Sequence, residues 1–406
     1  MNRAFRPSRI DRPAYFYLVL VLAVVLTPRI PLMPLGFGDL SLRVDGLGSA
    51  IAGLLALFIL TRNLGLAFLA ILLMILYLRD INTALVSMGL YLQIFSIILL
   101  PFILLKLAKV HTGFSEWAVA KIERFLTAYA VFNVGLAFFS RLIEFEYCFD
   151  AENMTGCVGP YGLLDRPYIF AVFVGCALVV ASGVRRINFP VLLILVFGCS
   201  ISDSRAISVI LLLVAIFSLY TFHRELFVKI LTLLFALIII LILAAPSGSK
   251  MSFGGAPNED GDPSWLMRLY NIDLYVQWLD SYKFIFGAGG LAFYQFSDAY
   301  GAPGPVDNLY IRLGSEIGVL GFIVLFYIFL NPLVRWKQTQ ISPLLISTFI
   351  VAVLSISIFH ESLIVPRAGH LISALGSYIC LKQYINSRRL DNSRRTREIR
   401  HLQSTI

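Results

Sequence analysis

Long apolar runs recur along the whole chain, and they constrain its fold more than any other feature. A helix needs about 20 apolar residues to cross a bilayer. We predict twelve spans, at about residues 14–34, 47–61, 64–78, 84–105, 124–143, 167–184, 188–201, 206–222, 227–245, 309–331, 341–359 and 368–385. Hydrophobic residues make up 58% of the chain and charged residues only 14%, which excludes a soluble globule. The expected fold class is an all-α polytopic membrane protein.

The positions of Lys and Arg predict the orientation of these spans. If the N-terminus is cytoplasmic, roughly two-thirds of the 33 Lys and Arg residues fall in cytoplasmic segments, in line with the positive-inside rule. An even number of spans then places both termini inside (N-in, C-in). The first span follows several arginines, as in a signal peptide, but lacks a small-residue cleavage site, so we expect an uncleaved anchor.

The hydrophilic segments divide the chain into four parts. Residues 1–245 hold the first nine spans and a smaller outer loop at 144–166, and residues 309–385 hold the last three spans. Between them, residues 246–308 form a large outer loop, the only extramembrane segment large enough for chemistry. Residues 386–406 form a basic cytoplasmic tail.

The large outer loop contains a predicted surface helix. Within Ser264–Phe286 the apolar residues recur at helical spacing: Trp265, Leu269, Ile272, Val276 and Leu279. This pattern predicts an amphipathic helix that lies on the outer leaflet.

The smaller outer loop contains two cysteines, Cys148 and Cys157. In an oxidising compartment they can close a small disulfide-bonded loop, whereas in the cytosol they stay reduced. The sequence favours neither state.

No metal, cofactor or nucleic acid is expected. The sequence Asp260-Gly-Asp262 matches the DxD metal motif of nucleotide-sugar glycosyltransferases, but so short a match arises by chance and the loop faces away from the cytosol. The chain has no GxxxxGK[ST] loop that would hold a nucleotide.

Arginines at the outer ends of spans are the candidates for binding phosphate. Their positions oppose the positive-inside rule; they are Arg166, Arg205, Arg268, Arg312 and Arg367. A guanidinium binds phosphate oxygens in bidentate fashion. The alternative for each arginine is snorkelling at the bilayer edge.

The segment that leads into the eighth span combines one of these arginines with a helix start. Ser200-Ile-Ser-Asp-Ser-Arg205 offers an arginine and free backbone N–H groups to an anion. The alternative is that Ser202, Asp203 or Ser204 caps the helix.

The start of the tenth span carries a polar stripe. Asn308, Arg312 and Glu316 recur every four residues and share one helix face. Glu316 is expected within the hydrocarbon, where an acid is functional by default, or else forms a private ion pair with Arg312. Asp307, just before the span, is a candidate general base or a simple helix cap.

Glycines follow in the same span. Gly314, Gly318 and Gly321 provide the small-residue spacing that allows close helix packing.

Several of these pieces together resemble the bacterial O-antigen polymerase and ligase superfamily. The pieces are Ser202-Asp-Ser-Arg205, Arg268 with Trp278, Phe286-Gly287-Ala-Gly-Gly290, and Asp307-Asn308-Leu-Tyr310 followed by Glu316, Gly318 and Gly321. The resemblance covers about residues 200–330. It implies a glycosyltransferase in the bacterial inner membrane with its active site facing the periplasm.

The resemblance also implies a substrate and roles for residues. The donor is an oligosaccharide on undecaprenyl pyrophosphate, and a second lipid-linked unit is the acceptor, so that repeat units join into a surface polysaccharide. Arg205, Arg268, Arg312 and Arg367 are candidates for the diphosphate, with Asp307 and then Glu316 as catalytic acids or bases. Asn308, Tyr310 and Trp278 are candidates for the glycan. Expected partners are membrane lipids and a chain-length regulator.

Two other functions stay open at this point. The family's ligases have a histidine before the Asn-x-Tyr element, and Asp307 occupies that place here, which favours a polymerase over a ligase that transfers glycan to lipid A-core. A lipid-oligosaccharide flippase or other transporter also fits twelve spans, but the large loop after the ninth span better suits an enzyme at the outer face.

Overall fold

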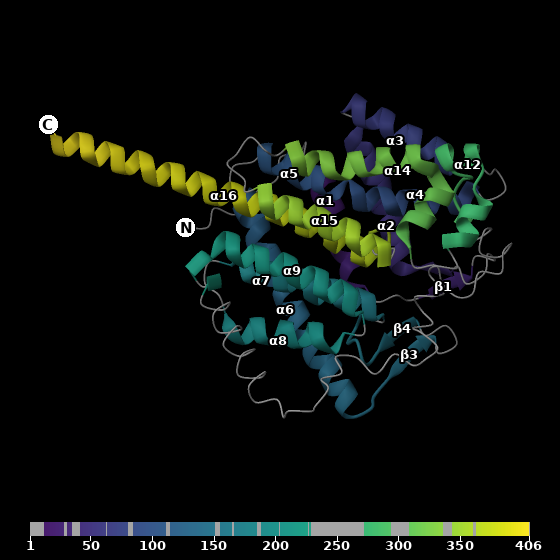
Figure 1. Cartoon of the computed structure of the whole chain (residues 1–406), viewed down its shortest axis with the longest axis horizontal. Helices are drawn as coiled ribbons and strands as arrows, with labels where there is room; N and C mark the ends of the chain where they lie inside the picture. Colours follow the sequence, from purple (N-terminus) through teal and green to yellow (C-terminus); the bar gives the residue numbers. More distant parts are fainter. Residues whose placement is uncertain are drawn as a thin grey trace, which may run out of the picture.

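The computed structural model is a bundle of helices (Figure 1). It describes residues 12–27, 31–34, 41–61, 63–79, 84–110, 114–150, 155–164, 166–184, 188–202, 204–225, 227–228, 272–293, 308–335, 343–359 and 363–405. Nearly all of the predicted ninth span lies outside these residues, as do Asp307, Arg268 and most of the large outer loop.

Apolar segments form the helices, as predicted. Their bounds are α1 Arg12–Leu26, α2 Val44–Leu60, α3 Leu64–Tyr77, α4 Ala84–Ile98, α5 Leu100–Val110, α6 Phe114–Leu142, α7 Pro167–Gly183, α8 Phe189–Ile201, α9 Arg205–Phe222, α12 Ser281–Phe286, α14 Leu309–Arg335, α15 Pro343–Phe359 and α16 Pro366–Thr405. Eleven of the twelve predicted segments therefore contain a helix, and of the remaining one, the ninth, only residues 227–228 are described.

The length of these helices leaves the number of membrane crossings open. Within the described residues, α6 and α14 are long and apolar enough to cross a membrane, and α4 with α5 make a third span if the bent pair counts as one. Several others are apolar helices of 10–17 residues. The chain is thus helical and of membrane type, and the described helices do not by themselves give twelve crossings.

Two short antiparallel hairpins were not predicted. Strand β1 (Pro31–Pro34) pairs with β2 (Ser41–Arg43), and β3 (Tyr147–Asp150) pairs with β4 (Thr155–Val158). The first hairpin contradicts the predicted span 14–34, because α1 already ends at Leu26. Pro28 explains the early end, since a proline disfavours helical geometry in the residue before it.

The predicted fourth span is bent. The axes of α4 and α5 differ by 41° at Leu99. Pro101 follows this bend, and its missing N–H removes the helical bond to the carbonyl of Ile97.

Helix α7 forms the centre of the bundle. Its residues from Ile169 to Gly183 are all buried, and it packs against α6, α8, α9 and α16. A helix that is apolar on every side lies either in a protein core or in a membrane, and the burial of α7 by these neighbours places it in the core of the bundle.

Helix α16 is much longer than predicted. The expected span 368–385 and tail 386–406 are one continuous helix from Pro366 to Thr405, which extends beyond the rest of the bundle (Figure 1). Its first turns are held firmly: the side chain of Arg367 is buried and donates to the carbonyls of Val25 and Leu163, both at 3.3 Å. His370 Nε2 lies 3.0 Å from Ser96 Oγ.

Candidate functional site

The most unusual feature of the backbone is a break inside α14. Gly318 has φ 64° and ψ −175°, which interrupts the helix. The carbonyls of Ser315 and Glu316, just before the break, accept hydrogen bonds from the backbone N–H groups of Ala288 and Gly289, at 2.8 and 2.9 Å. A segment of the outer loop thus replaces helical bonds that the break removes.

Glycine is required on both sides of this contact. Gly287 has φ 73°, and a Cβ there would lie 2.4 Å from the carbonyl oxygen of Glu316. A Cβ on Gly318 would lie 2.4 Å from the nitrogen of Gly287. Only glycine adopts such φ values without strain and permits so close a backbone approach. Residues 287–290 together with Gly318 are called the glycine junction below.

The glycine junction also contacts the end of α3. The N–H of Gly290 donates to the carbonyl of Tyr77 at 2.7 Å. Arg79 Nη1 donates to the carbonyl of Gly287 at 2.9 Å, and its guanidinium lies 5.2 Å from the ring centre of Tyr282 in α12. The junction therefore fixes α3, α12 and the N-terminal part of α14 relative to one another.

A buried charged cluster lies beside the junction. Glu316 is fully buried, and its carboxylate accepts a hydrogen bond from the Tyr77 hydroxyl. Arg312 Nε lies 3.4 Å from the other carboxylate oxygen of Glu316. The predicted alternative of an ion pair between Arg312 and Glu316 is thus observed, with Tyr77 as a third member. Burial of a charged pair is tolerated because each charge is balanced by its neighbours.

A small apolar cluster borders Arg312 on the loop side. Leu274, Phe293 and Ile311 are buried together, and the Arg312 guanidinium lies 5.9 Å from the Phe293 ring centre. Tyr275 packs against this cluster, where burial raises its pKa to about 12, so its hydroxyl is protonated at neutral pH. A Cβ on Gly314 would lie 2.2 Å from that hydroxyl, so Gly314 gives Tyr275 its place against α14.

The predicted amphipathic helix over Ser264–Phe286 is broken. Residues 272–278 are helical, the chain then leaves the helix, and α12 begins at Ser281. Asp280 causes the new start, because its side chain accepts the N–H of Lys283 at 2.7 Å. That backbone hydrogen bond keeps the pKa of Asp280 below its ordinary value, so the cap is charged at neutral pH.

Two residues of the predicted apolar face, Ile272 and Val276, are exposed. Leu274, which was not part of that face, is buried with Phe293 and with Ile311 of α14.

The glycan candidates all make contacts within the protein. The Asn308 side-chain oxygen accepts the N–H groups of Tyr310 and Ile311, at 2.9 and 3.3 Å, and so caps α14. The Tyr310 hydroxyl donates to the carbonyl of Leu354 at 2.9 Å. The ring of Trp278 lies 4.7 Å from the Lys283 ammonium.

The phosphate candidates are spread over several places. Arg312 belongs to the charged cluster. Arg367, at the start of α16, donates to the backbone carbonyls of Val25 and Leu163. Arg205 is the first residue of α9, as predicted. Its neighbour Ser204 makes no side-chain cap bond, and the Ser202 hydroxyl accepts the N–H of Ser204 instead. Arg268 and the candidate base Asp307 fall outside the described residues.

Sequence reasoning missed Tyr77 and Arg79. Both follow an apolar run like many others in this chain, and their role depends on contacts with residues more than 200 positions away. A single clue was available: Arg79 is a further basic residue at the predicted outer end of a span.

Within the described part of the chain, no group of three or more His, Cys, Asp or Glu side chains is placed to hold a metal ion.

Comparison with known proteins identifies one domain. Residues 190–326 match the family model described as O-antigen ligase. No curated protein matches the chain. The match confirms the predicted resemblance to the O-antigen polymerase and ligase superfamily, and it covers α8 from residue 190, α9, residues 246–308 and α14 as far as residue 326. Together with the apolar helices, it indicates a bacterial membrane protein.

Proposed function

We propose that this protein is a polymerase that joins oligosaccharide repeat units, carried on undecaprenyl pyrophosphate, into a surface polysaccharide. The observation that carries this proposal is the buried Tyr77–Glu316–Arg312 cluster beside the glycine junction, of which Arg312 and Glu316 belong to the segment that matches the family. The place of the ligase histidine is taken by Asp307, which favours a polymerase.

The proposed site faces the periplasm of the inner membrane. Tyr77 is the last residue of α3, and Leu309 is the first residue of α14. The site therefore lies at the end of the bundle where α3 ends and α14 begins. In the proposed topology of twelve spans with both termini inside, that end is the outer one. The excess of Lys and Arg in the opposite segments supports this orientation.

The proposed reaction is a single glycosyl transfer. A sugar hydroxyl of the acceptor attacks the anomeric carbon of the donor and forms the new glycosidic bond. The bond from that carbon to the pyrophosphate oxygen breaks, and the undecaprenyl pyrophosphate leaves with the bonding electrons. The hydroxyl proton passes to the carboxylate of Asp307, our candidate base.

The departing diphosphate gains negative charge that cations must stabilise. Arg205, Arg268 and Arg312 are the proposed cations. Since the Glu316 carboxylate, which the Tyr77 hydroxyl holds, lies against Arg312 Nε, we propose that Glu316 positions the guanidinium. Glu316 is thus a positioning residue in this proposal. It is the second candidate for the general base, after Asp307.

The contacts of several candidate residues limit the roles that we propose for them. Arg367 donates to two backbone carbonyls and is buried in the bundle, so we rank it last among the diphosphate candidates. Asn308 uses its oxygen as a helix cap, which leaves its amide NH₂ as the group for a glycan. Tyr310 and Trp278 stay the candidates for sugar stacking, although Phe322 packs on the Tyr310 ring and Lys283 on the Trp278 ring.

The test is polymerisation by the purified protein in lipid vesicles, with lipid-linked repeat units as the sole substrate and a ladder on a gel as the readout. Arg205→Ala should abolish the ladder, and Arg205→Lys should reduce it clearly because an ammonium lacks the guanidinium fork. Arg224→Lys, at the other end of α9, is the matched control and should behave as wild type.

Two results would contradict the proposal. A normal ladder from Arg205→Lys would make Arg205 an interfacial anchor only. Transfer to added lipid A-core in preference to a second repeat unit would identify a ligase, the function that the matching family's description names.

A further inference from the structure

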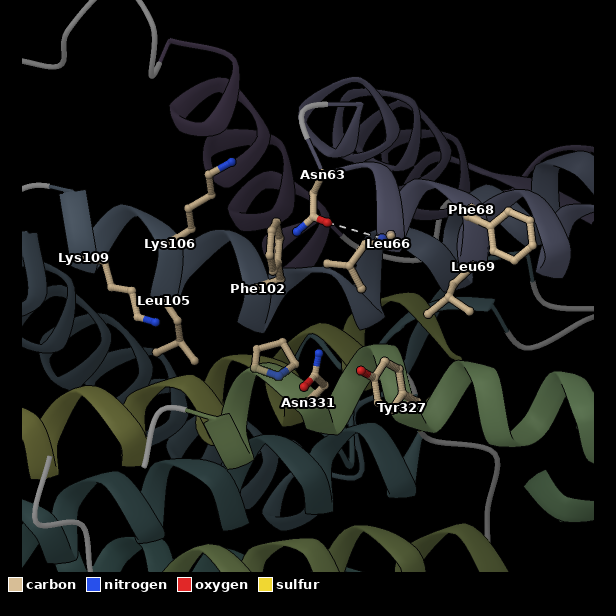
Figure 2. Close-up of a pocket in the computed structure, with 12 residues that line it drawn as sticks. Asn63, Leu66, Phe68, Leu69, Phe102, Leu105, Lys106, Lys109, Tyr327 and Asn331 are labelled. Atoms are coloured by element: carbon tan, nitrogen blue, oxygen red, sulfur yellow. Dashed lines mark hydrogen bonds between the residues drawn. The ribbon is translucent and has the colours of Figure 1, made fainter. Parts of the chain in front are cut away.

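A second site lies at the opposite end of the same helices. A pocket of about 630 Å³ opens between α3, α5 and α14, where α3 begins and α14 approaches its end (Figure 2). The 14 residues of α3 separate this pocket from Tyr77 by about 20 Å, at 1.5 Å per residue. The pocket is therefore separate from the Tyr77–Glu316–Arg312 cluster.

The polar lining of this pocket is positively charged. Lys106 and Lys109, one turn apart, come from α5, and no carboxylate is among the described residues that line it. Figure 2 shows Asn63 on one wall, with Tyr327 and Asn331 of α14 on the opposite wall. The side-chain oxygen of Asn63 accepts the N–H of Leu66, so the positive end of the α3 dipole also points to this region.

The remaining lining is apolar and open to the side of the bundle. Phe68 is 67% exposed, and it lines the pocket together with Leu69. The Lys106 ammonium lies 5.6 Å from the ring centre of Phe102, so the charged and apolar parts adjoin. A ligand that fits both parts has an anionic head and a hydrocarbon tail.

We infer that this pocket binds an anionic glycerophospholipid of the cytoplasmic leaflet, with the headgroup phosphate at Lys106 and Lys109 and an acyl chain along Phe68. The amides of Asn63 and Asn331 and the Tyr327 hydroxyl are within the same pocket and supply neutral hydrogen bonds to the head. Basic pockets between transmembrane helices recognise lipid headgroups by this combination of charge and shape. The inference is independent of the proposed transferase activity, because it concerns binding at the other end of α3 and α14.

Native mass spectrometry of the full chain in detergent, with phosphatidylglycerol as the probe and zwitterionic phosphatidylcholine as the comparison, tests this inference. The wild type should retain phosphatidylglycerol preferentially. The double variant Lys106→Gln/Lys109→Gln should weaken that retention on the order of tenfold, because each lysine contributes to attraction of an anionic lipid. Lys106→Arg/Lys109→Arg, which keeps both charges, should retain it.

Two further variants separate this pocket from general attraction to a basic surface. Lys121→Gln/Arg124→Gln removes the same charge from exposed positions on α6 and should leave binding unchanged. Asn331→Leu changes no charge, but should reduce retention several-fold if the lipid head occupies the pocket.

Three outcomes would overturn the inference. They are equal loss in the α6 control, unchanged retention in Lys106→Gln/Lys109→Gln, and displacement of the lipid by an excess of inorganic phosphate, which would identify a site for the free anion. Unfolding temperatures of all variants should match wild type, since none of the substituted side chains belongs to the buried core.

Discussion

Tyr77 and Glu316 share a buried hydrogen bond across 239 positions of the chain. Tyr77 lies outside residues 190–326, the segment that matches the O-antigen ligase family. The charged cluster is therefore completed by a helix from the first part of the chain, and the family segment alone does not contain the whole candidate site.

The charged cluster gives the first prediction. Glu316→Gln keeps an acceptor for Tyr77 but removes the counter-charge of Arg312, and breaking a buried pair costs about 3–5 kcal/mol. We expect a clearly lower unfolding temperature and loss of the polymer ladder. The double variant Glu316→Met/Arg312→Met should recover most of the stability, but not the activity.

Tyr77→Phe provides the graded comparison. It removes one hydrogen bond from a buried carboxylate, at a cost of about 1–3 kcal/mol. If Glu316→Gln leaves both stability and polymerisation unchanged, Glu316 neither balances nor positions Arg312.

The glycine junction gives the second prediction. Gly287→Ala and Gly318→Ala should each destabilise the protein by several kcal/mol, because the added Cβ meets backbone atoms at 2.4 Å and requires a positive φ. The matched control is Gly89→Ala in α4, where nothing lies within 4 Å of the added Cβ. That change should stabilise the helix by about 0.5–1 kcal/mol.

The difference in stability is measured by heating each variant in detergent and monitoring the loss of folded protein by size-exclusion chromatography. Wild-type stability in both junction variants would mean that the outer loop does not dock into the break of α14.

Asp307 gives the third prediction. Asn308 already caps α14, so Asp307→Asn should leave the unfolding temperature unchanged. If Asp307 is the base, Asp307→Asn should lower the polymerisation rate by about a hundredfold or more, because an amide takes no proton. Asn308→Ala, by contrast, should cost about 1 kcal/mol of stability.

A time course of the ladder with purified lipid-linked units decides between the two roles. Normal ladders from Asp307→Asn would show that Asp307 is not the base. The base would then be Glu316, or the reaction would use no protein base.

The β3–β4 hairpin gives the fourth prediction. Cys148 and Cys157 are directly paired in its register, which favours a disulfide if this loop lies in the oxidising periplasm. Closing a loop of this size stabilises a protein by about 2–3 kcal/mol. Alkylation of denatured, unreduced protein should leave these two thiols unmodified while it labels Cys176, Cys199 and Cys380, which are free.

Reduction before alkylation should add two labels. Full labelling of Cys148 and Cys157 without a reductant would show that the loop is not crosslinked, and would also weaken its assignment to the periplasm.

The sequence predicted those parts of the fold that depend on local hydrophobicity. The apolar runs of α7, α8 and α9 give helices within one residue of the expected bounds. The spacing of Arg312 and Glu316 gave their ion pair as one of two alternatives, since residues four apart share a helix face, and the pair is observed.

The structural features that the sequence did not predict depend on contacts between distant segments. Nothing local marks a break at Gly318, because the apolar pattern of α14 continues through it; the break is stabilised by Ala288 and Gly289, which come from another segment. Gly318 was expected to serve close helix packing, and its main role is instead a positive φ. Likewise, Asp280 reads as one polar residue in an amphipathic pattern until its cap bond to Lys283 is known.

The uninterrupted length of α16 has a mechanical consequence. Its 40 residues span about 60 Å, twice the thickness of the hydrocarbon layer. Because Arg367 and His370 hold its first turns inside the bundle, the helix can act as a rigid lever with its fulcrum in the core. A change in the direction of its far end is therefore coupled to the middle of the bundle, which a flexible tail would not allow.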